Sequence, residues 1–215
     1  MNKKNSLPSL VFFGTPLFAS HCLKSLLDDN FKILSVVTAP DRKAGRGKKL
    51  TSSSVKQLAE SFELPIFQPI NLKESKFITQ LTELKADIFV VVAFRMLPKV
   101  VWSLPKYGSI NLHASLLPNY RGAAPINWVL INGEKKTGIT TFFIDEKIDS
   151  GSILLQKEVS IDLNDNAGSL HDKIVFQGAT LIIDTLKGIQ SGILNSRKQN
   201  ITKFEFEAPK LSAEN

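Results

Sequence analysis

Cysteine is nearly missing from this 215-residue sequence, in which Cys22 stands alone and cannot form an internal disulfide. The composition still supports a packed core, because 43% of the residues are hydrophobic and 22% are charged. Such a core without disulfides is typical of a reducing compartment, and we expect the protein in the cytoplasm. Histidine is also scarce: His21, His113 and His171 are scattered, and without metal-ligand spacing we expect no metal.

Long hydrophobic runs are missing as well. The apolar stretch near the N-terminus ends at Gly14, too early for a secretory signal or a membrane span. The longest uninterrupted run, Ile88 to Phe94, has the length of a strand. We therefore expect a soluble protein without a membrane partner, folded as one domain with at most a short appendage.

Positive charge is concentrated in one stretch of the chain. The sequence has 27 basic and 20 acidic residues, a net charge of +7. Residues 42–49 hold five of the cations and no acid. This cluster indicates a polyanionic partner, although a solvated loop has the same composition.

Strand and helix patterns alternate along the sequence. Short apolar runs predict strands at residues 9–13, 31–38, 64–67, 87–94, 108–113, 138–144 and 152–159. Apolar residues at helical spacing predict helices at 18–27, 53–62, 76–84 and about 169–189, with shorter helical segments after Pro98 and Pro125. This order predicts an α/β fold with a doubly wound, mostly parallel, Rossmann-like sheet. Its ligand crevice is expected beyond the carboxyl ends of the strands.

A dinucleotide site has no support in the first strand-to-helix turn. That turn reads Gly14-Thr15-Pro16 and lacks the later glycines of the G-x-G-x-x-G pattern. The crevice must therefore serve another ligand.

Asn111 and His113 end the predicted strand 108–113. Because they are two residues apart, their side chains leave the same face of the strand. A carboxamide beside an imidazole can stabilise an oxyanion that forms from a carbonyl. Taken alone, an Asn-x-His pair is more often a turn cap next to a surface histidine.

Two loops could complete a site around this pair. In the turn 145–151, Asp149 could orient His113 or accept protons through water, although acids and a glycine between strands are usually only a hairpin turn. The segment 115–122 combines an irregular backbone with apolar side chains and an arginine. Such a segment offers the apolar walls and free backbone groups that a fused-ring ligand needs.

The runs NLHASLLPNYRGAAPI and GITTFFIDEKIDSG resemble the formyltransferases that use 10-formyltetrahydrofolate as formyl donor. The resemblance implies that Asn111, His113 and Asp149 are the catalytic residues. It also implies a folate contact through the segment after the histidine, which is made of Ser115, Leu116, Leu117 and Pro118. The fold implied by this family is the Rossmann-like one predicted above.

Three further segments are similar to the branch of this family that formylates methionyl-tRNA: FFGTPLFA, PDRKAGRGKKL and RGAAPINW. The resemblance implies a formyl transfer to the amino group of methionyl-initiator tRNA, in translation initiation, by a monomer. In that branch the second segment contacts the acceptor arm of the tRNA, which implicates Arg42, Arg46, Lys48 and Lys49. A cationic loop there could follow phosphates, with binding that weakens as salt rises.

The chain departs from the family in two places. Its segment 93–98 lacks the Tyr-Gly of many members and is one residue shorter, which would reshape the wall beside the pterin. We expect residues 1–204 to form the catalytic domain and 205–215 a linker or tail, without the β-barrel that holds tRNA in the family. Two alternatives stay open: a formyltransferase for a small amine such as an amino sugar or nucleotide precursor, and a catalytically weak module that binds folate or tRNA.

Overall fold

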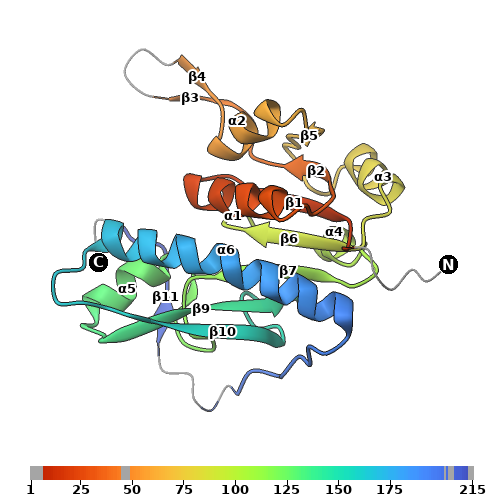
Figure 1. Ribbon diagram of the computed structural model, residues 1–215. Coiled ribbons are helices and arrows are strands. Elements are labelled where there is room, and N and C mark those ends of the chain that lie inside the picture. The colour runs from red at the N-terminus through yellow and green to blue at the C-terminus, as the bar shows by residue number, and fades with distance from the viewer. Residues whose placement is uncertain (1–6, 45–48, 201, 203–205, 213–215) are drawn as a thin grey trace. The chain divides into compact units, whose positions relative to one another are not determined.

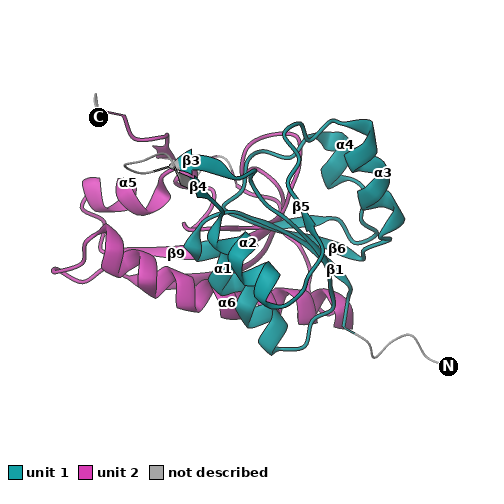
Figure 2. Ribbon diagram, turned by 90° about the horizontal axis from the view of Figure 1, so that it is seen from above, with its two compact units in different colours: residues 1–110 teal, residues 111–215 magenta. Residues whose placement is uncertain are grey.

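The computed structural model describes residues 7–44, 49–200, 202 and 206–212. The chain divides into two compact units, unit 1 with residues 1–110 and unit 2 with residues 111–215 (Figure 2). The hydrogen-bonded strand order is β10-β9-β7-β6-β1-β2-β5, with the boundary between the units inside β7 (Ser109–His113). This is the α/β class that the alternation of strands and helices predicts.

Unit 1 is built on a parallel sheet whose strands are β1 (Leu10–Gly14), β2 (Ile33–Val37), β5 (Ile66–Phe67) and β6 (Ile88–Val92). The pairs β1–β2, β1–β6 and β2–β5 are all parallel. Every residue of β1 and β6 is buried. Strands covered on both faces need such continuous apolar runs, which is why their sequences show no alternation.

Helices cover both faces of this sheet. They are α1 (Leu17–Asp28), α2 (Ser54–Ser61), α3 (Ser75–Glu83) and the short α4 (Lys99–Trp102). Figure 2 shows α1 and α2 on one side of the unit 1 strands and α3 and α4 on the other. The change of side occurs where the chain passes from β5 back to β6 beside β1, as a doubly wound sheet requires.

The basic stretch of unit 1 begins and ends in strands, which the sequence reasoning missed. β3 (Arg42–Ala44) and β4 (Lys49–Thr51) form an antiparallel pair in which Arg42 lies opposite Thr51 (Figure 1). Residues 45–48 between them lie outside the described part of the chain. The basic stretch therefore begins and ends in paired strands, and we call residues 42–51 the β3–β4 arm.

Unit 2 contains an antiparallel pair, β9 (Lys136–Phe143) and β10 (Ile153–Ser160), together with α5 (Pro125–Ile131) and α6 (Ala167–Ser191). α6 packs along β9 and β10 (Figure 1). A second, two-stranded sheet pairs β8 (Arg121–Gly122) with β11 (Glu207–Ala208) in parallel. The expected tail thus contributes a strand to unit 2.

The 25-residue helix α6 has a well-defined start. The Asn166 side chain accepts hydrogen bonds from the backbone N–H groups of Gly168 and Ser169, and the Ser169 hydroxyl accepts one from the Asn166 N–H. This reciprocal capping satisfies donors that the first turn leaves unpaired. No helix within the described residues is long and apolar enough to span a membrane.

An ion cluster lies next to that cap. Lys173 Nζ lies 2.5 Å from Asp165 Oδ2 and 2.6 Å from Asp162 Oδ2. The hydrogen bond from Lys173, helped by those from the Asp162 backbone and Ser169, lowers the pKa of Asp165 to about 2. Because this folded-state pKa is depressed, the contact stabilises the fold above the carboxyl's usual pKa, and that contribution is lost as pH falls toward 2.

We expect Asn166→Ala to lower the free energy of unfolding by about 1 kcal/mol, since it removes the acceptor of the cap. For a chain of this size that corresponds to a fall in Tm of roughly 2–4 °C, measurable by calorimetry. Asn195→Ala, at an exposed position beyond α6, is the matched control and should leave Tm unchanged. Equal melting of both variants would contradict the capping role.

Candidate active site

Strand β7 places Asn111 and His113 on one face. Ile110 and Leu112, which alternate with them, are buried, and this fixes the register of the strand. Asn111 is half-buried, and its side-chain amide makes no hydrogen bond to any described residue. Within the described part of the chain, nothing competes for its N–H groups.

The ring of His113 is held by the backbone carbonyl of Tyr120. His113 Nε2 lies 2.7 Å from the Tyr120 oxygen, and the ring is buried. A carbonyl oxygen can only accept, so Nε2 carries a proton. Nδ1 is therefore the ring nitrogen that the Tyr120 carbonyl leaves without a proton. Tyr120 is itself anchored, because its hydroxyl donates to Glu134 and its ring stacks on Phe206.

Asp149 faces that free nitrogen. Its Oδ2 lies 3.5 Å from His113 Nδ1 and accepts a hydrogen bond of 2.9 Å from the backbone N–H of Gly122. Only 7% of the His113 side chain and 13% of the Asp149 side chain are exposed, so water screens the pair poorly.

The turn that carries Asp149 depends on glycine. Asp149 adopts a left-handed conformation with φ +49°, which Asp tolerates better than most residues. At Gly151 a Cβ would lie 1.6 Å from the carbonyl oxygen of Phe143, so no larger residue fits. Gly122 has φ +120°, and a Cβ there would lie 2.5 Å from the Ala208 oxygen. A side chain at position 122 or position 151 would therefore collide with backbone atoms, so the contacts that position Asp149 require glycine at both positions.

The segment expected to contact folate has two buried and two partly exposed members. Ser115 is fully buried and donates to the Asn119 carbonyl, while Leu117 packs with Phe142 and Ile153. Leu116 and Pro118 are half-buried and remain partly accessible. The structure thus leaves Leu116, Pro118 and backbone groups as the accessible surface of this segment.

Two residues around the pair were missed by sequence reasoning. Tyr120 acts through its carbonyl, which is present in every residue and leaves no signal in a sequence. Gln199 donates from Nε2 to the carbonyls of Asp149 and Gly151, both at 2.8 Å, from a position 48–50 residues further along the chain. No local spacing could have indicated such a contact.

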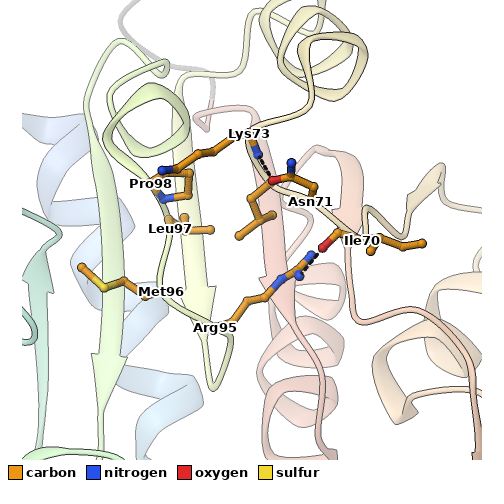
Figure 3. Close-up of a pocket in the computed structure, with 8 residues that line it drawn as sticks. Ile70, Asn71, Lys73, Arg95, Met96, Leu97 and Pro98 are labelled. Carbon is orange, nitrogen blue, oxygen red and sulfur yellow. Dashed lines mark hydrogen bonds between the residues drawn. The ribbon is translucent and has the colours of Figure 1, made fainter.

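Unit 1 has a separate cavity of about 500 Å³ (Figure 3). Its wall comes from the loop after β5 and the loop after β6, with lining residues Ile70, Asn71, Leu72, Lys73, Arg95, Met96, Leu97 and Pro98. Figure 3 shows Arg95 reaching from one loop to the other, where its guanidinium donates to the Ile70 carbonyl. The guanidinium also donates to the Pro69 carbonyl. Four residues of the segment 93–98, which sequence reasoning associated with the pterin, therefore line one side of this cavity: Arg95, Met96, Leu97 and Pro98.

The base of the β3–β4 arm leaves cations exposed. Asp41, at its start, accepts from Lys56 at 2.5 Å and from Gln68 at 2.8 Å, and these bonds lower the pKa of its carboxyl. Its charge is thus neutralised by Lys56. Arg42 and Lys43 are exposed, and neither makes an ion pair with another described residue.

The remaining cations predicted in the arm cannot be placed. Arg46 and Lys48 lie outside the described residues. Lys49 begins β4, and its side chain is likewise outside the description. In the described part of the chain, no group of three His, Cys, Asp or Glu side chains is arranged to hold a metal ion.

The chain matches the family described as "Formyl transferase" over residues 8–186. It is 50% identical over 206 residues to the methionyl-tRNA formyltransferase of Flavobacterium johnsoniae, covering 96% of this chain and 65% of that protein. It therefore spans a little less than two thirds of the length of that relative.

Solved structures of formyltransferases share the fold. The glycinamide ribonucleotide transformylase 1 of Symbiobacterium toebii matches 93% of this chain and 96% of its own, with a TM-score of 0.75 and 16% identity. The N-formyltransferase of Helicobacter canadensis, solved with folinic acid and dTDP-3-aminofucose, matches 92% of this chain and 70% of its own, with a TM-score of 0.70 and 25% identity. With the family match covering most of the sequence, the chain belongs to the formyl transferase family.

Proposed function

We propose that the protein transfers a formyl group from 10-formyltetrahydrofolate to the amino group of methionyl-initiator tRNA. The observation that carries the proposal is the buried His113–Asp149 pair, with Asn111 free on the same strand as the histidine. The 50% identity to a methionyl-tRNA formyltransferase supports the acceptor. We also propose that the protein is monomeric and acts in the cytoplasm, where translation takes place.

Asn111 is assigned to the developing oxyanion. When the amine attacks the formyl carbon, negative charge moves to the formyl oxygen, and a fixed amide donor stabilises that charge more than it stabilises the ground-state carbonyl. The amide of Asn111 has no competing partner among the described residues, so it needs no rearrangement before it donates.

His113 and Asp149 are assigned to the proton. The attacking amine loses one proton, and the folate nitrogen that leaves the formyl carbon gains one. Asp149, whose Oδ2 lies opposite His113 Nδ1, can take the first proton through water, while His113 holds its carboxylate in place. The proton then returns through water to the leaving nitrogen, so both groups end the reaction as they began it. The Tyr120 carbonyl keeps Nε2 out of this exchange.

The cavity of unit 1 is assigned to part of the folate. Its volume lies within the range of small-molecule sites, and Met96 and Leu97 give it an apolar wall. Folinic acid in the Helicobacter canadensis enzyme supports a folate as the formyl donor. In unit 2, the family resemblance supports Ser115, Leu116, Leu117 and Pro118 as folate contacts, and of these Leu116 and Pro118 are partly accessible.

The β3–β4 arm is assigned to the tRNA, through Arg42, Arg46, Lys48 and Lys49. Its support is the exposed cation pair Arg42 and Lys43, together with the absence of any acid in residues 42–49. Electrostatic contact with phosphates releases counterions, so affinity should fall steeply with salt.

A small amine is the alternative acceptor, because the structural relatives include an enzyme solved with an amino sugar nucleotide. An assay that supplies 10-formyltetrahydrofolate with methionyl-tRNA, or with an amino sugar nucleotide or glycinamide ribonucleotide, separates the two functions. Formylation of the tRNA supports the proposal, and transfer to a small amine with none to tRNA overturns it.

Asn111→Ala should lower kcat roughly a hundred- to a thousand-fold, because one oxyanion donor is lost. Asn111→Asp keeps the size of the side chain but removes the donor, so it should be equally slow. Both variants should keep the Tm and the folate affinity of the parent, measured by calorimetry and fluorescence titration. Near-parental kcat in either variant would refute the role of Asn111.

Met96→Asp should raise the KM for the formyl donor about tenfold or more, since folate binding would desolvate a carboxylate in the cavity wall. Val100→Asp is the matched control, because Val100 is also an exposed apolar residue but lies outside the cavity lining. Equal KM values in the two variants would remove the cavity from the folate site.

The double variant Arg42→Glu with Lys43→Glu should bind tRNA at least tenfold more weakly in low salt and show a shallower salt dependence. Lys24→Glu with Lys198→Glu makes the same charge change at exposed positions outside the arm and serves as control. A gel shift at several salt concentrations measures both. Identical affinities would show that the arm is only a solvated surface.

A further inference from the structure

Gln199 lies between the two loops that orient the His113–Asp149 pair. It is half-buried and follows α6 by eight residues. Its Nε2 donates to the carbonyls of Asp149 and Gly151, both at 2.8 Å. Its Oε1 accepts from Arg121 Nη2 at 2.6 Å and from Arg121 Nε at 3.2 Å. Both donors and both acceptor sites of the amide are therefore in use.

The contact with Arg121 reaches both members of the pair. Arg121 stands between Tyr120, whose carbonyl holds His113 Nε2, and Gly122, whose N–H holds Asp149 Oδ2. The other end of the Gln199 amide holds the backbone of Asp149 itself. One side chain thus connects the backbone that fixes the imidazole to the backbone that fixes the carboxylate.

Asp149 needs such a support. Its left-handed conformation is costly for a residue with a side chain and persists only when surrounding contacts favour it. Within the turn, Asp145 accepts hydrogen bonds from the Lys147 N–H and the Ser150 hydroxyl, and neither bond involves Asp149 itself. The bonds from Gln199 to residues 149 and 151 clamp the turn at the point where the carboxylate leaves it.

We propose that Gln199 is a positioning residue for the reaction, one that keeps Asp149 Oδ2 opposite His113 Nδ1 by fixing the two loops to each other. The expected effect on catalysis rests on the proposed function. The expected effect on the two loops rests only on the hydrogen bonds of Gln199. The two substitutions closest to glutamine in size each fail one or both needs. Glutamate would accept from Arg121 but set an oxygen against two carbonyls, and methionine matches glutamine in size without donating or accepting.

Gln199→Met tests the proposal in the whole protein, with Gln199→Glu as a second variant. We expect kcat to fall roughly ten- to a hundred-fold in both, the size of effect that a displacement of about 1 Å produces. KM for the formyl donor and for methionyl-tRNA should stay within about twofold, because Gln199 is assigned no contact with either. Lys198→Met, at the exposed neighbouring position, should leave kcat unchanged.

Two further measurements separate positioning from a general loss of structure. If Gln199 acts through Asp149, the double variant Gln199→Met with Asp149→Asn should be no slower than Asp149→Asn alone. Hydrogen exchange of the Gly122 amide, followed by NMR, should be faster in Gln199→Met than in the parent or in Lys198→Met. This readout needs no substrate.

The outcomes keep the two proposals apart. If the parent protein formylates no methionyl-tRNA, the proposed function fails, and the exchange of the Gly122 amide still decides whether Gln199 couples the loops. If the parent is active and Gln199→Met has the same kcat, the positioning role is overturned. Additive losses in the double variant would overturn it as well, because Gln199 would then act independently of Asp149.

Discussion

The hydrogen bond from His113 Nε2 to the Tyr120 carbonyl is the contact on which the site depends. It fixes the ring plane, commits one nitrogen to the backbone and leaves Nδ1 facing Asp149. Without it the imidazole could rotate or exchange its tautomer, and the carboxylate would face either nitrogen. The bond is made by backbone, so its strength depends on how well the Tyr120 loop is held. Tyr120 meets that need through its hydroxyl on Glu134 and its ring on Phe206.

Residues 206–209 also support the Tyr120 loop. The Tyr120 N–H donates to the Phe206 carbonyl, and β8 pairs with β11 immediately afterwards. Trp128, on α5, donates to the Pro209 carbonyl. The segment expected to be only a linker therefore supplies backbone partners to the loop that orients the histidine. A catalytic geometry set by backbone contacts of this kind needs glycine where chains approach closely, as at Gly122 and Gly151.

The parts of the structure that the sequence predicted are those with local signals. The apolar run Ile88 to Phe94 indicated a strand, which the structure has as β6, and the two-residue period of a strand put Asn111 and His113 on one face of β7. The strands β8 and β11 have two residues each, too few for any period, and exist through contacts between segments about 85 residues apart. The contacts of Gln199 were missed for the same reason. Its bonds to Asp149 and Gly151 join residues 48 to 50 positions apart, and no local pattern encodes such a contact.

Under the proposed function, specificity for the acceptor amine must come from outside Asn111, His113 and Asp149. An amide, an imidazole and a carboxylate recognise the changes in charge at a formyl carbon, and those changes are the same for every acceptor amine. Discrimination therefore needs a second surface that binds the rest of the acceptor. The β3–β4 arm has the required property, because Lys56 neutralises Asp41 and leaves Arg42 and Lys43 without a nearby described anion. Any phosphorylated acceptor is attracted to that surface, and a tRNA gains the most because it presents many phosphates at once.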